Sequence, residues 1–173
     1  MSIINLAKNV KRTDTKCNFA KKNQTRFCDM ADVHTKEIRS YNMSQIKGKD
    51  TKPEMLVRKF LFSNGFRYRL HEKKLPGKPD IVFPKLKTVI FIHGCYWHGH
   101  ENCKYFVLPK TRTDWWSQKI SRNKELDLIN SDFLANKGWI VITIFECELK
   151  PAKRDATLLR LIGKLNIIQT DKK

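Results

Sequence analysis

The fold is decided by the stretch PGKPDIVFPKLKTVIFIH, residues 76–93. Its first four residues contain two prolines and a glycine and predict a turn. The apolar runs 80–83 and 88–92 predict two strands, and the four residues between them are few enough for a hairpin. Asp80 begins the first strand and His93 follows the second, so we expect both side chains at the same edge of the sheet.

The segments on either side of this hairpin predict an α/β fold. Thr51-Lys52-Pro53-Glu54 has the pattern of a helix start with a capping box, and Asn64-Gly65 ends that helix. The later elements are predicted to be a helix over 113–136, a strand over 139–145 and a weaker helix over about 154–165. This last strand is apolar on both faces, which favours a central place in a mixed sheet flanked by helices.

Apolar periodicity separates two neighbouring tryptophans on the helix over 113–136. At 100° per residue, Trp115 falls in one arc with Leu126, Ile129 and Phe133. Trp116 falls in a second arc, about 100° away, with Ile120, Asn123 and Asp127. We predict that Trp115 lies in the core. Trp116 shares its face with an acid, so it either faces a ligand or packs on a second surface.

The charge of the chain indicates a polyanionic partner. Its 173 residues carry 35 Lys and Arg against 17 Asp and Glu, a formal charge of +18, and nucleic acid is the first candidate. A membrane is the other candidate, but no apolar run approaches the ~20 residues of a spanning helix, and no signal-like segment follows the start. We therefore expect a cytoplasmic protein with no membrane partner.

The first 29 residues differ from the rest of the chain. They contain seven Lys and Arg against two Asp and show no sustained apolar period, which predicts a disordered basic extension. Residues 30–173 are enough for one domain with its own core. Alternatively, Met30 is the functional start and the preceding residues are extra sequence.

The cysteines favour a metal site. The chain has five, an odd number, and no secretory signal, so a disulfide framework is unfavoured. Cys95, His100 and Cys103 offer three ligands in one loop, and Cys147 follows the strand over 139–145. A tetrahedral zinc site of these four would have no open position and would stabilise the fold rather than catalyse. Buried free cysteines are the alternative, and His98 could replace His100.

Asp80 and His93 suit the hydrolysis of a phosphodiester. Mg²⁺ prefers carboxylate, carbonyl and water oxygens, and the reaction also needs a group that activates water or protonates the leaving oxygen. In the structural alternative, Asp80 caps a turn and His93 fills a gap in the core.

Several motifs together resemble the very short patch repair DNA mismatch endonucleases of bacteria, from Met30 to about Leu149. The motifs are Met30-Ala31-Asp32-Val33-His34, Pro76-Gly77-Lys78-Pro79-Asp80, His93-Gly94-Cys95-Tyr96-Trp97-His98, Thr111-Arg112-Thr113 and Glu146-Cys147. The resemblance implies a restriction-endonuclease-like core. It also implies a strand-specific nick 5′ to the thymine of T:G mismatches that arise from deamination of 5-methylcytosine.

The resemblance further implies roles for single residues. Asp80 would bind Mg²⁺ together with the backbone carbonyl of Ile92, where the family commonly has Thr. A role through the carbonyl is compatible with Ile, whereas a hydroxyl role would be lost. His98 would be the general base, assisted by Asp127, and His93 would contact the phosphate or the leaving oxygen.

Other positions also match the family. Glu54 matches an acid near the metal-bound waters, although its capping-box position already gives it a structural role. The implied Zn²⁺ ligands are the same four, Cys95, His100, Cys103 and Cys147. Tyr96, Trp97 and Trp116 match rings that the family inserts beside the mismatch, and Met43 matches a residue inserted from the opposite groove. Residues 30–48 would then have to order on DNA.

Two other functions stay open. A restriction-type endonuclease would cut both strands of paired DNA, normally as a dimer, and a zinc-stabilised DNA-binding module would have no activity. For the mismatch nickase we expect a monomer that acts on double-stranded DNA containing a T:G mismatch. The resemblance adds mismatch-repair proteins as candidate partners, without identifying a surface for them.

Overall fold

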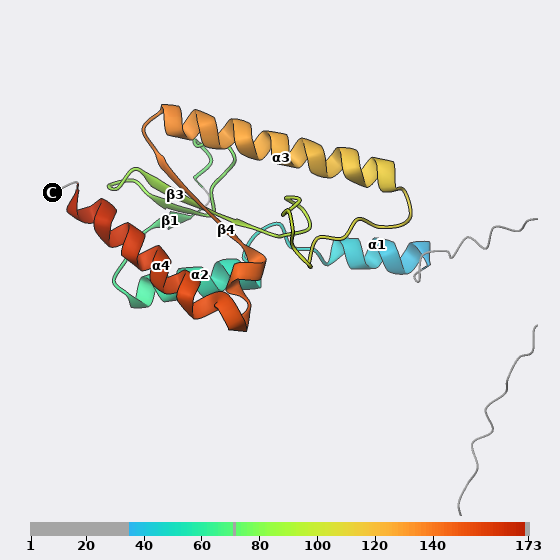
Figure 1. The fold of residues 1–173 in the computed structure, drawn as a ribbon, viewed down its shortest axis with the longest axis horizontal. Coiled ribbons are helices and arrows are strands. Elements are labelled where there is room, and N and C mark those ends of the chain that lie inside the picture. The colour runs from blue at the N-terminus through green and yellow to red at the C-terminus, as the bar shows by residue number, and fades with distance from the viewer. Residues whose placement is uncertain (1–34, 71, 172–173) are drawn as a thin grey trace, which may run out of the picture. The chain divides into compact units, whose positions relative to one another are not determined.

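A computed structural model of the chain describes residues 35–70 and 72–171. Its centre is a four-stranded sheet in the order β1-β2-β3-β4 (Figure 1), formed by Arg69–Leu70, Ile81–Phe83, Thr88–His93 and Ile140–Phe145. The first three strands are antiparallel, and β4 runs parallel to β3. The predicted mixed sheet and the predicted hairpin of β2 and β3 are therefore confirmed. The proposed extension, residues 1–29, lies outside the described residues.

Helices cover both faces of this sheet. In Figure 1, α3 (Thr113–Asn136) lies over one face, and α2 (Lys52–Ser63) and α4 (Pro151–Thr170) lie over the other. Side chains of the three long strands alternate between two hydrophobic clusters. Ile90 packs in the cluster shared with α2 and α4, and its neighbours Val89 and Phe91 pack in the cluster that contains Leu134 of α3. This alternation follows the two-residue period of a strand and explains why β3 is apolar throughout.

The strand register gathers functional side chains at one end of the sheet. His93, the last residue of β3, lies opposite Phe145, the last residue of β4. The loop 94–112 follows β3, and the short helix η1 (Glu146–Leu149), which contains Cys147, follows β4. Parallel strands bring their carboxyl ends to the same edge, so the two segments meet there, and ligands commonly bind at this edge in α/β folds.

The prediction that the strand over 139–145 is central is wrong. β4 is the last strand of the sheet, and Ile140 and Thr143 are exposed. Its apolar character has a different cause, because Val141 packs in the cluster on the α3 face and Ile142 and Ile144 pack in the cluster on the opposite face. A strand covered on both faces looks the same in sequence at an edge and in the centre.

The prediction that Trp115 lies in the core is also wrong. The whole arc is exposed, with exposed fractions of 46% for Trp115, 46% for Leu126, 54% for Ile129 and 50% for Phe133. The second arc packs inward instead, because Ile120 and Leu134 are 3% and 1% exposed. Periodicity identified both apolar faces of α3 correctly. It could not determine which one faces the sheet.

The bounds of the remaining helices match the predicted ranges to different degrees. α2 begins and ends where predicted, with Pro53 in its first turn and Gly65 at a φ of 84° just beyond its end. α4 is longer than the predicted helix over about 154–165. No sequence pattern predicted β1 or α1 (Lys36–Ser44), and the side chains of α1 are all exposed. Among the described residues, no helix is both long and apolar enough to cross a membrane.

Candidate active site

A cavity of about 1170 Å³ opens at the edge of the sheet where β3 ends. Its walls come from residues 45–50, the start of α2, the turn before β2, the end of β3, the loop after it, α3 and η1. The titratable side chains that line it are those of Asp50, Glu54, Lys47, Lys52, Lys78, Asp80, His93, His98, Asp127 and Glu146. The predicted residues Asp80, His93, His98, Asp127 and Glu54 are thus brought together around one space.

Asp80 is fixed by the turn that precedes it. One of its carboxylate oxygens, Oδ2, accepts a hydrogen bond of 2.7 Å from the backbone N–H of Ile92 on β3. The turn itself packs closely, since a Cβ on Gly77 would lie 3.1 Å from the Phe91 ring and 3.2 Å from Cβ of Asn130. Gly77 also has a φ of 71°, a conformation that favours glycine. The Pro-Gly turn therefore sets the position of the carboxylate.

His98 and Asp127 form a close pair across the cavity. Nδ1 of His98 lies 2.6 Å from Oδ2 of Asp127, and both side chains are half-buried. An imidazole held by a carboxylate in this way keeps one ring orientation and one tautomer. Asp127 belongs to the inward arc of α3, four residues after Asn123, so the helix period places it toward the loop.

His93 lies beside this pair and is more deeply buried. Its ring stacks on that of His98, with centroids 3.7 Å apart and an interplanar angle of 6°. Burial, and to a smaller extent the neighbouring His98, lower the pKa of His93 to about 4, against the opposing effect of Asp127. His93 is therefore neutral near pH 7. Its Nδ1 lies 3.9 Å from Oδ2 of Asp127, and the two do not form an ion pair at that pH.

Three rings gather next to the histidines. Tyr96 contacts Trp97 and Trp116, with centroids 5.2 and 5.6 Å apart, and the two tryptophan rings are 6.1 Å apart. Asn123 of α3 donates a hydrogen bond of 2.8 Å from Nδ2 to the carbonyl oxygen of Trp97 and so ties the loop to the helix. All three rings are partly exposed. The triad named from the sequence is thus a real cluster.

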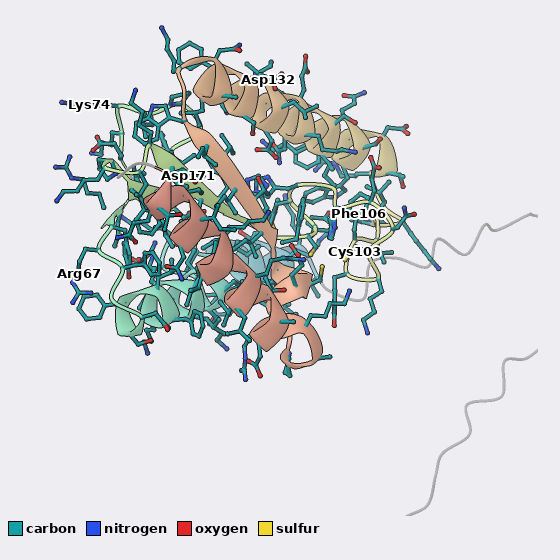
Figure 2. All side chains as sticks on the ribbon, turned by 60° about the vertical axis from the view of Figure 1, so that its left-hand side comes forward. Arg67, Lys74, Cys103, Phe106, Asp132 and Asp171 are labelled. Carbon is teal, nitrogen blue, oxygen red and sulfur yellow. The ribbon has the colours of Figure 1, made fainter. Side chains whose placement is uncertain are left out.

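A second group of side chains converges behind the loop. The ligand atoms of Cys95, His100, Cys103 and Cys147 all lie within 4.8 Å of one another, and Cys147 Sγ is 3.4 Å from His100 Nδ1. Cys103 lies in the loop between β3 and α3 (Figure 2). Burial raises the pKa of the Cys95 thiol to about 12, and a cation that binds its sulfur would displace the proton. Three sulfurs and one imidazole make a donor set typical of structural zinc.

This geometry separates the two histidines that the sequence left open as ligands. His100 lies with the cysteines and stacks on Phe145, with centroids 3.8 Å apart, whereas His98 is held by Asp127. Phe145 also contacts His93 edge-on at 5.8 Å. One phenyl ring therefore separates the group around Cys95 from the group around Asp127.

Known proteins with similar sequences fall in one family. The family model described as DNA mismatch endonuclease Vsr matches residues 31–104. Type II nicking enzyme V.NmeAIP of Neisseria meningitidis is 53% identical over 121 residues, which cover 70% of this chain and 86% of that protein. Type II nicking enzyme V.XorIIP of Xanthomonas oryzae is 49% identical over 120 residues, 69% and 88% of the two chains. DNA mismatch endonuclease Vsr of Escherichia coli is 42% identical over 121 residues, 70% and 77% of the two chains.

The chain belongs to the Vsr family. It is a DNA endonuclease, and the resemblance stated from the motifs is confirmed. The match to the family model contains the start of α2, the Pro-Gly turn, the end of β3 and the loop through His100, which all line the cavity, but not α3 or η1.

Glu54 occupies a different environment from the other residues named for the Vsr site. Its carboxylate accepts bonds from Arg58 Nη2 at 2.8 Å, the backbone N–H of Asp50 at 2.9 Å and Thr51 Oγ1 at 2.8 Å. The predicted capping box is not formed, because the backbone donor to Glu54 is Asp50 instead of the N-cap residue Thr51, and the Thr51 hydroxyl donates to the carboxylate instead of capping the helix. These contacts give Glu54 a structural role, and its catalytic role stays a prediction.

Ile92 and Met43 are two further residues that were named from the sequence. The Ile92 side chain packs against the cluster shared with α2 and α4, while its backbone holds Asp80, so the change from Thr removes a hydroxyl from the core side of β3. Met43 is on α1 and is 47% exposed. It belongs to a different element from the three rings, and its insertion into DNA stays a prediction.

Sequence reasoning missed two positioning residues of this Vsr-family site. Asn123 shares the inward arc of α3 with Asp127, and the i,i+4 spacing could have identified it as a second anchor for the loop. Arg58 is buried and follows Glu54 by four residues, at the spacing of a helical ion pair. Neither residue has a distinctive motif, so only the period of the helix carries a signal.

Proposed function

We propose that this chain is a magnesium-dependent nickase that cuts one strand of DNA 5′ to the thymine of a T:G mismatch, as a repair step after deamination of 5-methylcytosine. The relatives named DNA mismatch endonuclease Vsr and type II nicking enzyme support both the substrate class and the single-strand cut. The observation that carries the proposal is the pairing of His98 with Asp127 in the cavity that Asp80 lines.

The carboxylate of Asp80 fits a magnesium ion. It is an oxygen donor that lines an open cavity, and its position is set by the Ile92 N–H. Mg²⁺ takes oxygen ligands and keeps several waters, so Asp80 and the Ile92 carbonyl would be its protein ligands. When bound, the ion would supply charge neutralisation at the phosphate and a more acidic water.

The two histidines would then divide the proton transfers. His98, oriented by Asp127, would accept a proton from the attacking water. His93 is neutral near pH 7 and buried against Phe145, so it would bind the phosphate or the leaving oxygen through a ring N–H. The aspartate would fix the tautomer of His98 and stabilise the imidazolium as it forms.

The ring cluster supports recognition of a mispaired step. Tyr96, Trp97 and Trp116 are partly exposed next to the histidines, and stacking on a base is worth roughly 1–3 kcal/mol by alanine substitution. A T:G pair stacks weakly, so rings that enter beside it would disrupt less base stacking than at a correctly paired step. The net binding energy would therefore be larger at the mismatch. The charge of +18 would supply binding to phosphates, which positions the protein but carries no sequence information.

We also propose that Cys95, His100, Cys103 and Cys147 hold one structural Zn²⁺, and that the protein acts as a cytoplasmic monomer. All four ligands come from protein side chains, so no position would be open for catalysis. The ion would tie the loop after β3 to η1 and so hold the rings and His98 in place.

The test is cleavage of labelled duplexes that differ at one pair, T:G, T:A or C:G, with and without Mg²⁺. The proposal expects a single nick on the thymine strand of the T:G duplex, only with Mg²⁺, and none with Asp80→Ala. Equal cutting of both strands in the paired duplexes would instead indicate a restriction-type enzyme. Tight binding of T:G duplex without any cut would indicate a binding module.

A further inference from the structure

Two groups of side chains that could bind a metal converge among the described residues. One is the cysteine group, and the second lies in the cavity. His93, His98 and Asp127 each offer one donor atom, and these atoms lie within 4.8 Å of one another. Two imidazole nitrogens and a carboxylate oxygen form a recurrent ligand set of transition metals. This set also faces the cavity, where a small ion can enter.

We propose that His93, His98 and Asp127 form a second divalent-metal site, selective for Zn²⁺ and similar transition metals, and that its occupation inhibits nicking. The inhibitory part rests on the proposed function, because it needs His98 to act as the base. The binding part rests on the geometry alone. The site differs from the Cys95 group in ligand type and from the Asp80 position in preferred metal.

The chemistry of the donors selects the ion. Imidazole nitrogen suits Zn²⁺, Co²⁺ and Ni²⁺, whereas Mg²⁺ prefers oxygen and keeps its waters. Mg²⁺ at Asp80 and Zn²⁺ at the histidines therefore do not compete for the same ligands. An excess of Mg²⁺ should leave the second site filled.

The spacing of the donors is close to that of a tetrahedral site. With bonds of about 2.0–2.1 Å, neighbouring ligands around zinc are about 3.3 Å apart. The observed separations from Oδ2 of Asp127 are 2.6 Å to His98 Nδ1 and 3.9 Å to His93 Nδ1, one shorter and one longer than this value. Shifts of well under 1 Å would make both separations suitable.

One ring must also turn. The two imidazoles are parallel, with an interplanar angle of 6°, so their lone pairs do not yet point at a common ion. His93 is held by ring contacts to Phe91 and Phe145 at 5.6 and 5.8 Å. His98 is half-buried at the cavity wall and is the ring with room to rotate. A water from the cavity would complete the fourth position.

The consequence for activity follows from the lone pairs. A metal bound to Nδ1 of His98 replaces the proton that this nitrogen shares with Asp127. The one proton of the neutral ring then sits on Nε2, the nitrogen that would accept the proton of the attacking water, so His98 can no longer act as the base. Loss of a general base costs at least about 100-fold in rate. We therefore expect micromolar Zn²⁺ added to the zinc-loaded enzyme to slow nicking of T:G duplex about 100-fold, with recovery after a zinc-selective chelator at constant Mg²⁺.

The binding test uses the full chain with its cysteine group already loaded with zinc. Addition of Co²⁺ should give a second metal equivalent with visible d–d absorption and no thiolate-to-cobalt charge transfer. His98→Gln and, separately, Asp127→Asn should lose this equivalent and keep the first zinc by mass measurement under non-denaturing conditions. Asp132→Asn, an exposed acid on the same helix, should bind the second equivalent unchanged.

The outcomes separate the two parts of the proposal. A single metal equivalent in the unsubstituted protein, or a second equivalent that His98→Gln retains, would overturn the site. A second equivalent with undiminished nicking would overturn the inhibition. If the protein nicks no duplex at all, the proposed function fails, while the cobalt spectrum still decides whether the site exists.

Discussion

At the scale of single residues, the site depends on positions fixed by backbone contacts more than by side-chain motifs. Asp80 is held by the amide of Ile92, and the carbonyl of Trp97 is held by Asn123. Asp127 then orients His98 from a helix that is distant in sequence. The proposed catalytic groups are therefore already positioned without substrate, which would reduce the cost of assembling them in the transition state.

Asp127 is the residue that best tests this positioning. Asp127→Asn keeps the volume but removes the carboxylate that fixes the orientation and tautomer of His98, so nicking of T:G duplex should slow about 100-fold or more. Affinity for the duplex should change little. Single-turnover nicking and gel-shift titration measure the two effects. The control is Asp132→Asn, which removes the charge of an exposed acid on the same helix. It should match the unsubstituted enzyme in both measurements.

Gly99 is a residue where backbone geometry decides stability. It has a φ of 54°, and a Cβ there would lie 2.7 Å from Cγ2 of Ile120 and 2.9 Å from Cδ of Lys124. Gly99→Ala should lower the free energy of unfolding by about 1–3 kcal/mol, measured by urea denaturation. Gly163→Ala is the matched control, because it is helical and meets no atom within 4 Å. Gly163→Ala should raise the free energy of unfolding by up to about 1 kcal/mol. An equal loss of unfolding free energy in both variants would contradict the packing of the loop on α3.

At the scale of elements, α3 shows both the strength and the limit of sequence reasoning. Its bounds, Thr113–Asn136, are those predicted from the pattern and from Gly138 beyond its end. Its two apolar arcs were also separated correctly. The inward arc proved to be the one with Asn123 and Asp127, because these polar side chains have partners on the loop after β3. A pattern of apolar residues does not contain that information, since the partners come from another segment.

Two neighbouring residues test which arc packs on the sheet. Leu134 is 1% exposed and belongs to the cluster with Val89 and Phe91, whereas Phe133 is 50% exposed. Leu134→Ala should cost about 2–5 kcal/mol in unfolding free energy. Phe133→Ala should stay within about 0.5 kcal/mol, although phenylalanine is the larger residue. The reverse order of the two losses would contradict the orientation of α3.

At the scale of the whole molecule, the sequence predicted most of the fold and a set of residues that the structure brings together around one cavity. The hairpin, the strand after α3 and the cysteine group were all predicted, because turns, apolar runs and ligand spacing are local signals. The edge position of β4 and the exposure of Trp115 were not predicted. Both depend on which surfaces meet in three dimensions. The choice of His100 over His98 in the cysteine group also needed the structure.

The net charge predicts a measurable property of the whole molecule. Binding to DNA should weaken steeply with salt, because a protein that contacts 6–10 phosphates loses about 10³–10⁵ in affinity between 50 and 200 mM salt. The dissociation constant of T:G duplex, measured with Asp80→Ala so that the DNA stays intact, should follow this slope. A dependence corresponding to only one or two phosphates would contradict a main role for the charge of +18.

The most direct test of the central claim is the position of the cut in a duplex that contains one T:G pair, with each strand labelled in turn. Since Asp80, His98 and Asp127 line one cavity, the enzyme should make one Mg²⁺-dependent cut, 5′ to the mispaired thymine, and leave the guanine strand intact. Cuts on both strands, or an equal rate on the T:A duplex, would contradict the account.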